Sequence, residues 1–412
     1  MDLIIGAGIT GLSYAAYTNN DYIVIEKDDQ VGGYCRTIKQ DGFVWDYSGH
    51  FFHFQDQAIK NLIFNGMNAD DVLTVTKRTQ IKYKDRLVDY PFQKNIHQLP
   101  QQEFIDCLYD LFQNPVKDYS TFKQMLYAKF GKSIAEKFLI PYNQKLYACD
   151  LDTLDVDAMG RFFPFADKED IIANFKTNPA TSYNATFLYP KGGAMEYVHS
   201  LCRHVDMSKV CLNEYITHID LQAHVATTNK RQIHYDNLIS TMPFPALLTL
   251  TATPFNKSLY TCNKVLVFNI GFDRKGLEVN NNWIYYPESK YIFYRVGFYD
   301  NIFQKDRLSV YVEIGYKDDQ PIDYDYAFQR TLHDMQLAGI TTPQHRVVSH
   351  NTLLMNPAYV HITKQMEQDR ARKMEQLGNS DVFSIGRYGS WIYCSIEDNI
   401  KQSKSLASQL SR

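Results

Sequence analysis

Long apolar runs are missing from this 412-residue sequence, and no stretch approaches the ~20 consecutive apolar residues that a membrane-spanning helix needs. An excess of charge of one sign is missing too, since 43 Lys and Arg residues face 46 Asp and Glu residues. This balance argues against a nucleic-acid or membrane-surface protein. A signal peptide is not expected, because Asp2 stands where a basic segment would be and glycines interrupt the apolar start.

Cysteine pairs and histidine clusters are also absent. The 7 Cys residues show no C-x-x-C spacing, and the 12 His residues form no H-E-x-x-H motif, so we expect no metal. An odd number of cysteines in a large chain favours reduced thiols in a cytoplasmic protein. The length exceeds that of a single core and predicts two or three domains.

A glycine-rich turn follows the first short apolar strand of the chain. Gly6, Gly8 and Gly11 precede a helical stretch, and a second apolar strand then ends on Glu26. This order fits the Rossmann fingerprint, in which the helix N-terminus binds phosphate and the acid binds a ribose hydroxyl. A glycine-rich turn in an unrelated α/β domain is the alternative. The cofactor-binding residues expected here are Gly6, Gly8, Ile9, Thr10, Gly11, Glu26 and Lys27.

A second glycine pair, Gly32-Gly33, indicates which nucleotide is bound. With Glu26 before it and Thr37 after it, the pair resembles the E-x5-G-G-x-x-x-T/S pattern of glutathione-reductase-like and amine-oxidase-like flavoproteins. Arg36 lies inside this pattern, and its planar fork suits a diphosphate. An NAD enzyme has no need of the second pair, so FAD is favoured. Gly33, Tyr34 and Arg36 join the expected cofactor-binding residues.

The remaining chain predicts an interleaved mixed α/β fold. We expect strands over 80–84 and 86–90, helices from 101 and over 122–130, a helix break at Pro141, and a final helix with Ser395 as its N-cap. The predicted domains are a discontinuous Rossmann-like FAD-binding domain (1–75, 190–250 and 330–412), a helical insertion (95–175), and an antiparallel-sheet substrate-binding domain (76–94 and 255–329).

Several further stretches follow one another in an order that covers nearly the whole chain. The two most specific read Y-P-F-Q-K-N-I, from Tyr90, and G-R-Y-G-S-W-I-Y, from Gly386. The supporting stretches are 47–50, 141–145, 184–187, 190–193, 283–288 and 293–295. Together they resemble the UDP-galactopyranose mutase family, and its eukaryotic branch more than its bacterial one.

The resemblance implies an FAD-dependent isomerase that interconverts the pyranose and furanose forms of UDP-galactose or of a close nucleotide-sugar analogue. In that family N5 of reduced FAD attacks the anomeric carbon and displaces the diphosphate, with no net redox change. The resemblance also implies a role in supplying galactofuranose for cell-surface glycans. NAD(P)H is a candidate reductant, with Lys77 or Arg78 near its binding position, and a homo-oligomer is a candidate assembly.

The matching positions imply the residues of the site. The implied catalytic arginines, Arg161 and Arg295, would clamp the diphosphate as its bond to the sugar breaks. His50, a general-base candidate, lies in a loop under the flavin where the backbone is implied to matter more than the imidazole. Taken singly, Arg161 also fits a solvated loop, and any one of the 30 Tyr residues fits simple packing. The implied substrate-binding residues are Tyr90, Phe92, Gln93, Tyr142, Asn143, Tyr147, Asn184, Trp283, Tyr285 and Tyr393, and the flavin-side residues are Ser48, Gly49, Arg387 and Ser395.

Departures from the family leave the sugar and the nucleobase open. Tyr147 stands where the family often has Trp, Ser48 replaces a Gly, and segment 397–399 does not copy the usual sequence before the last helix. Two other classes stay open. An FAD-dependent oxidoreductase of the amine-oxidase or desaturase type shares the fold but has no use for two diphosphate arginines. A non-catalytic binder of the same fold is disfavoured by the intact flavin fingerprint.

Overall fold

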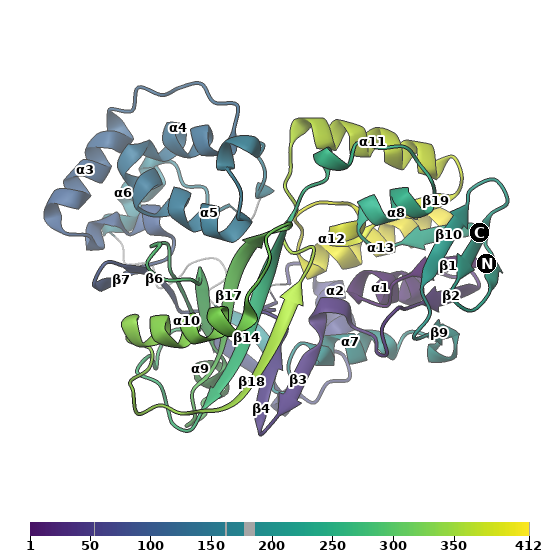
Figure 1. Ribbon diagram of the computed structural model, residues 1–412, viewed down its shortest axis with the longest axis horizontal. Helices are drawn as coiled ribbons and strands as arrows, with labels where there is room; N and C mark the ends of the chain where they lie inside the picture. Colours follow the sequence, from purple (N-terminus) through teal and green to yellow (C-terminus); the bar gives the residue numbers. More distant parts are fainter. Residues whose placement is uncertain (53, 161–162, 177–185, 412) are drawn as a thin grey trace.

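The computed structural model describes residues 1–52, 54–160, 163–176 and 186–411, and Figure 1 shows both chain termini on the side of the nucleotide-binding strands. The strands are β1 Asp2–Ile5, β2 Tyr22–Ile25, β3 Thr37–Gln40, β4 Phe43–Asp46, β5 Val72–Thr76, β6 Thr79–Tyr83, β7 Arg86–Asp89, β8 Thr186–Pro190, β9 Val210–Cys211, β10 Ile216–Asp220, β11 Val225–Thr228, β12 Gln232–His234, β13 Asn237–Ser240, β14 Asn263–Phe272, β15 Trp283–Tyr285, β16 Arg295–Phe298, β17 Ser309–Lys317, β18 Val347–Met355 and β19 Val382–Ser384. The α-helices are α1 Ile9–Tyr17, α2 Gln57–Phe64, α3 Gln101–Phe112, α4 Phe122–Ile134, α5 Ile140–Tyr147, α6 Lys168–Lys176, α7 Met195–Cys202, α8 Phe244–Leu250, α9 Tyr299–Phe303, α10 Tyr324–Leu337, α11 Lys364–Gly378, α12 Gly386–Gly389 and α13 Ile396–Leu410.

A five-stranded parallel sheet in the order β19-β13-β1-β2-β9 forms the nucleotide-binding core. Every residue of the central strand β1 is buried, as expected for a parallel strand covered on both faces. Helix α1 follows β1 after the glycine turn and packs along α13. The predicted Rossmann-like unit is therefore confirmed.

A seven-stranded sheet in the order β18-β14-β17-β16-β15-β6-β7 forms the second large layer. All neighbouring pairs are antiparallel except β15 and β6, which run parallel, so the predicted antiparallel sheet is in fact mixed. The predicted hairpin is confirmed, with β6 and β7 joined at Lys84-Asp85. The sheet places β17 beside helix α5.

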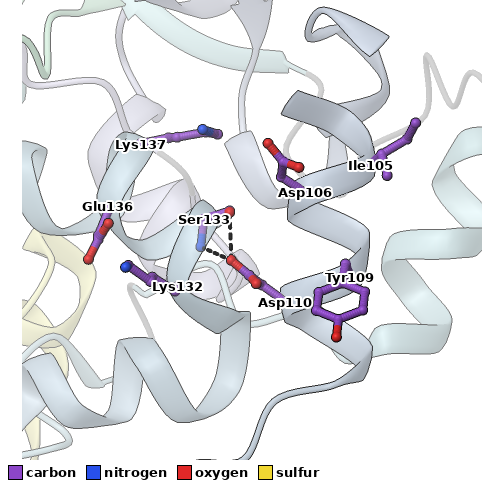
Figure 2. A pocket seen from close by; sticks show the side chains of 8 residues that line it. All are labelled: Ile105, Asp106, Tyr109, Asp110, Lys132, Ser133, Glu136 and Lys137. Carbon is purple, nitrogen blue, oxygen red and sulfur yellow. Dashed lines mark hydrogen bonds between the residues drawn. The ribbon is translucent and has the colours of Figure 1, made fainter. Parts of the chain in front are cut away.

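Helices α3 to α6 form the inserted unit at the upper left of Figure 1. Figure 2 shows its α3–α4 junction, where the Asp110 carboxylate accepts hydrogen bonds from Ser133 N and Oγ at 2.8 and 2.6 Å. The helix break predicted at Pro141 is wrong. Pro141 lies in the first turn of α5, where a missing N–H costs little, and α5 continues directly from a π-helical turn. The interruption lies instead at Gly131, whose φ is 75°.

The domain boundary predicted near residue 330 needs correction. Strand β18 pairs with β14, and α10 packs on the same sheet, so the chain returns to the nucleotide-binding layer only at α11 and β19. The polar run Ser349-His350-Asn351 belongs to an edge strand, which carries little of the apolar signal of a central strand. No helix within the described ranges is long and apolar enough to cross a membrane.

Candidate functional site

The glycine turn between β1 and α1 is built for close approach of a ligand. Gly6 has a φ of 98°, and a Cβ there would lie 2.3 Å from Thr241 Oγ1. A Cβ on Gly11 would lie 1.9 Å from the Gly6 carbonyl oxygen. Gly8 forms a bridge with Gly32 and starts α1 without a side-chain cap, so the first-turn N–H groups are open to a phosphate.

Glu26 and Arg36 organise the segment that follows β2. Glu26 is buried, and its two carboxylate oxygens accept hydrogen bonds from Ala7 N at 2.7 Å and Asp28 N at 2.9 Å. Arg36 forms an ion pair with Asp28 at 3.0 Å and donates to the Val31 carbonyl at 3.3 Å. Arg36 therefore shapes this loop, and its direct contact with a diphosphate stays a prediction.

The N-terminus of α13 closes the nucleotide-binding unit. Ser395 and Asp398 form a capping box, which confirms Ser395 as the N-cap. Asn399, one turn into this helix, accepts hydrogen bonds from Thr10 Oγ1 and from Arg387 N, both at 2.8 Å. A single amide thus joins α1, α12 and α13 around the phosphate-binding turn. The uncapped N-terminus of α1 and the junction of α1, α12 and α13 together fit the phosphate groups of an FAD molecule. Ile9 lies in the first turn of α1.

The loop after β4 carries Ser48, Gly49 and His50. Ser48 Oγ donates to the Glu313 carboxylate, and His50 Nδ1 lies 2.9 Å from the Ser48 carbonyl oxygen. Because a carbonyl only accepts, Nδ1 carries the proton. Burial lowers the pKa of His50 to about 4, so the imidazole is neutral at neutral pH. A Cβ on Gly49 would lie 2.4 Å from the Tyr311 hydroxyl oxygen, so this loop packs tightly on β17.

Arg295 and Glu313 form the charged centre of the site. They are direct cross-strand partners on β16 and β17, with Nε–Oε2 at 2.5 Å and Nη2–Oε1 at 2.7 Å. The Glu313 side chain is 1% exposed and that of Arg295 18% exposed. This bidentate pair fixes the guanidinium plane. Among the residues that the structure describes, Nη1 has no hydrogen-bond partner and can bind an anion.

Four tyrosines meet beside Arg295, and we call them the tyrosine cluster: Tyr90, Tyr142, Tyr285 and Tyr294. The Tyr285 ring centroid lies 5.1 Å from that of Tyr90 and 5.0 Å from that of Tyr142. Burial raises the pKa of Tyr90 and of Tyr142 well above the ordinary value, so both hydroxyls stay neutral. Neutral hydroxyls can donate hydrogen bonds to phosphate oxygens.

A second aromatic group surrounds Arg387. Its guanidinium carbon lies 4.6 Å from the Tyr393 ring centroid and 5.3 Å from that of Tyr359. Tyr359 stacks on Tyr393 at 5.7 Å and lies 5.9 Å from Tyr147. The predicted residues Tyr147, Arg387 and Tyr393 are thus brought together.

Lys77 is a third cation of the site. Its Nζ lies 6.0 Å from the Tyr90 ring centroid and 5.7 Å from the Trp283 ring centroid. Trp283 in turn stacks on Phe51, next to His50, with 4.9 Å between centroids. Burial lowers the pKa of Lys77. Aromatic faces partly compensate this buried charge, and a bound anion would compensate it more fully.

Three residues that the sequence predicts to contact substrate are deeply buried in this structure, and their contact with a substrate stays a prediction. Phe92 is fully buried against Phe138, with ring centroids 5.3 Å apart. Gln93 is fully buried and donates to the Pro164 carbonyl, and Asn143 donates to the carbonyl one helical turn before it, at 2.7 Å. Two further predicted residues, Arg161 and Asn184, lie outside the described residues.

Sequence reasoning missed Glu313, Tyr311, Tyr359 and Asn399. Glu313 carried a readable signal, since a lone carboxylate in the apolar strand 308–314 needs a buried partner. Tyr311 lies two residues before it on the same face of β17. No motif or spacing in the sequence marks Tyr359 or Asn399.

Comparison with known proteins places these features in a family. The family model described as flavin containing amine oxidoreductase matches residues 9–410. The chain belongs to this family. Flavin is accordingly its cofactor class, in agreement with the FAD expected from the glycine motifs.

The fold also matches a particular solved structure. A crystal structure of reduced UDP-galactopyranose mutase superposes with a TM-score of 0.91 at 24% identity, covering 99% of this chain and 95% of that one. Coproporphyrinogen III oxidase from Staphylococcus aureus is 23% identical over 320 residues, which cover 67% of this chain and 68% of the oxidase. Chloroplastic protoporphyrinogen oxidase from Nicotiana tabacum is 24% identical over 172 residues, covering 38% and 30% of the two chains. The fold is thus that of UDP-galactopyranose mutase, while the relatives include oxidases.

Proposed function

We propose that this protein is a flavin-dependent nucleotide-sugar mutase that interconverts the pyranose and furanose forms of UDP-galactose or a close analogue. The observation that carries the proposal is Arg295, a guanidinium oriented by Glu313 beside the neutral hydroxyls of the tyrosine cluster. An oriented arginine among hydroxyl donors suits a diphosphate leaving group. The similarity of fold to reduced UDP-galactopyranose mutase supports the same function.

Each side chain has a separate task in this proposal. Bound reduced FAD supplies the nucleophile for the anomeric carbon, and the reaction has no net redox change. Arg295 stabilises the negative charge that grows on the diphosphate as its bond to the sugar breaks. Hydroxyls of Tyr142 and Tyr285 donate to phosphate oxygens. Arg387 and Lys77 add positive charge, which offsets the neutralising effect of Glu313 on Arg295.

His50 takes a positioning task in this scheme. As a neutral imidazole that donates from Nδ1 to the Ser48 carbonyl, it fixes the backbone of residues 48–50. Ser48 in turn donates to Glu313, so the loop and the arginine clamp share one hydrogen-bond network. We also propose NAD(P)H as the physiological reductant, with the cation of Lys77 available for its phosphates.

The second candidate is an FAD-dependent oxidoreductase, and the similarity to porphyrinogen oxidases favours it. The carboxylates of a porphyrinogen would also pair with Arg295 and Arg387. The two candidates differ in electron balance. The mutase consumes no electrons over a turnover, whereas the oxidase passes two electrons to an acceptor for each bond it oxidises.

The proposal is tested with purified protein reduced anaerobically with dithionite and incubated with UDP-galactofuranose. Chromatography should show UDP-galactopyranose, and the oxidised protein should show none. Failure with UDP-galactofuranose and with other UDP-hexofuranoses, combined with aerobic oxidation of coproporphyrinogen III, would overturn the mutase and establish the oxidase.

A further inference from the structure

Lys145 lies on helix α5, where its ammonium group is surrounded by backbone carbonyls of one loop. Nζ lies 2.8 Å from the Tyr286 oxygen, 3.1 Å from that of Glu288 and 2.9 Å from that of Tyr291, and it also donates to the Phe293 oxygen. An ammonium has three N–H donors, so these four acceptors use all of them. Among the described residues Lys145 forms no ion pair with a carboxylate.

The loop that Lys145 binds connects two residues of the candidate site. Residues 286–294 connect Tyr285, the last residue of β15, to Arg295, the first residue of β16. The helix that supplies the lysine also supplies Tyr142, whose ring lies 5.0 Å from that of Tyr285. One side chain therefore joins the two elements that meet at the candidate diphosphate position.

The backbone of α5 is fixed against the sheet at the same point. A Cβ on Gly315 of β17 would lie 2.2 Å from the Lys145 carbonyl oxygen, so only glycine permits this approach. Asn263 Nδ2 of β14 donates to the Leu146 carbonyl at 2.6 Å. Glu313 lies two residues before Gly315 on the same strand. Together with the Lys145 hydrogen bonds, these contacts fix the helical insertion against the strands that carry Arg295 and Glu313.

We propose that Lys145 is a positioning residue of the site, which ties α5 to the loop between Tyr285 and Arg295 and so sets their spacing from Tyr142. Its effect on turnover rests on the proposed mutase function, whereas its effect on loop order does not. Since four carbonyl oxygens face the nitrogen, the ammonium is the form that holds the loop. A neutral amine has one donor fewer and turns a lone pair toward an oxygen.

The charge of Lys145 is open to titration. Burial lowers the pKa of Lys145 to about 7, while Asp334 and Glu288 act in the opposite direction. The other charged groups around the lysine are Lys84, Glu136, Lys137 and Lys290. The loop should therefore loosen as pH rises through neutrality.

The test compares Lys145→Met, Lys145→Arg and the control Lys290→Met, which removes an exposed ammonium from the same loop. Hydrogen exchange is read at the amides of Tyr286, Ile292 and Tyr294, which are hydrogen-bonded in the structure. In Lys145→Met these amides should exchange about tenfold faster at unchanged FAD content. The KM for UDP-galactofuranose should rise about tenfold with a smaller change in kcat, and Lys145→Arg should recover part of both. Lys290→Met should match the wild type.

Several outcomes separate this inference from the proposed function. Unchanged exchange and KM in a folded, FAD-loaded Lys145→Met protein would overturn the positioning role. Faster exchange in Lys145→Met would support the positioning role of Lys145 even if the wild-type protein converts no nucleotide sugar. That lack of conversion would refute the mutase function alone. If Lys145→Met fails to fold, Lys145→Gln replaces it with the same readouts, and unchanged exchange and KM in the folded, FAD-loaded Lys145→Gln protein would overturn the proposal.

Discussion

Arg295 and Glu313 face each other across β16 and β17, and the guanidinium binds both carboxylate oxygens, at 2.5 and 2.7 Å. Both side chains are largely buried, so each compensates a charge that would otherwise be costly in this position. The pair also reaches the loop of Ser48 through the Glu313 carboxylate. The arginine that would bind the diphosphate therefore has its orientation set by a strand neighbour and by the loop after β4.

Glu313→Gln tests this orientation. The amide keeps the shape of the side chain but loses one acceptor and the charge, so Arg295 is no longer held by two bonds. We expect kcat to fall by about 10²-fold, as for loss of one oriented group at a developing charge, with a lower Tm. Steady-state mutase kinetics and thermal unfolding measure both effects. Glu375→Gln, on the exposed face of α11, should change neither, and wild-type kinetics in Glu313→Gln would refute the orienting role.

Arg295→Lys tests the diphosphate clamp itself. A lysine keeps the charge but cannot bind Glu313 bidentately and still present a second face to the diphosphate. We expect kcat/KM to fall by about 10²- to 10³-fold while the flavin stays bound. The exposed Arg274 provides the control substitution, Arg274→Lys. Full activity in Arg295→Lys would mean that a different residue carries the leaving-group charge.

Asn399→Ala tests the junction of α1, α12 and α13. The substitution removes the acceptor for Thr10 Oγ1 and Arg387 N and should cost about 1–3 kcal/mol of stability. Because the junction surrounds the phosphate-binding turn, FAD should dissociate more readily. The flavin-to-protein absorbance ratio after dialysis measures this, with Asn379→Ala, at the exposed end of α11, as control. Equal retention of FAD in both variants would contradict a role of Asn399 in FAD binding.

The sequence predicted the nucleotide-binding half of the molecule well because local signals define it. Gly6 is required by its positive φ, and Gly11 is required by its close contact with the Gly6 carbonyl oxygen in the same turn. The partner of Arg295 could not be predicted, since Glu313 reaches it only through the register of two strands. The burial of Phe92 and Gln93 could not be predicted either, because a motif shows which residues recur together, and not which of them face the core.

The acid sensitivity of the protein should depend in part on His50. Burial lowers its pKa to about 4 from an ordinary value of 6.5, so the unfolded chain binds a proton first as pH falls. This contribution to stability is complete above pH 6.5 and is lost as pH falls through 4. Urea unfolding at pH 7 and pH 5 should show a smaller loss in His50→Asn than in wild type. Between pH 6.5 and 8, kcat of the wild type and of His50→Asn should depend on pH in the same way. If the wild type shows a pH-dependent change in kcat that His50→Asn lacks, His50 acts as an acid or base.

The most direct test of the account counts turnovers per electron pair. Protein reduced anaerobically with one equivalent of dithionite per flavin, then freed of excess reductant, is mixed with excess UDP-galactofuranose while flavin absorbance and sugar products are followed. The account predicts many molecules of UDP-galactopyranose per flavin, with the flavin still reduced at the end. Substrate conversion that stops at one molecule per flavin, or a flavin that reoxidises in step with the chemistry, would contradict it.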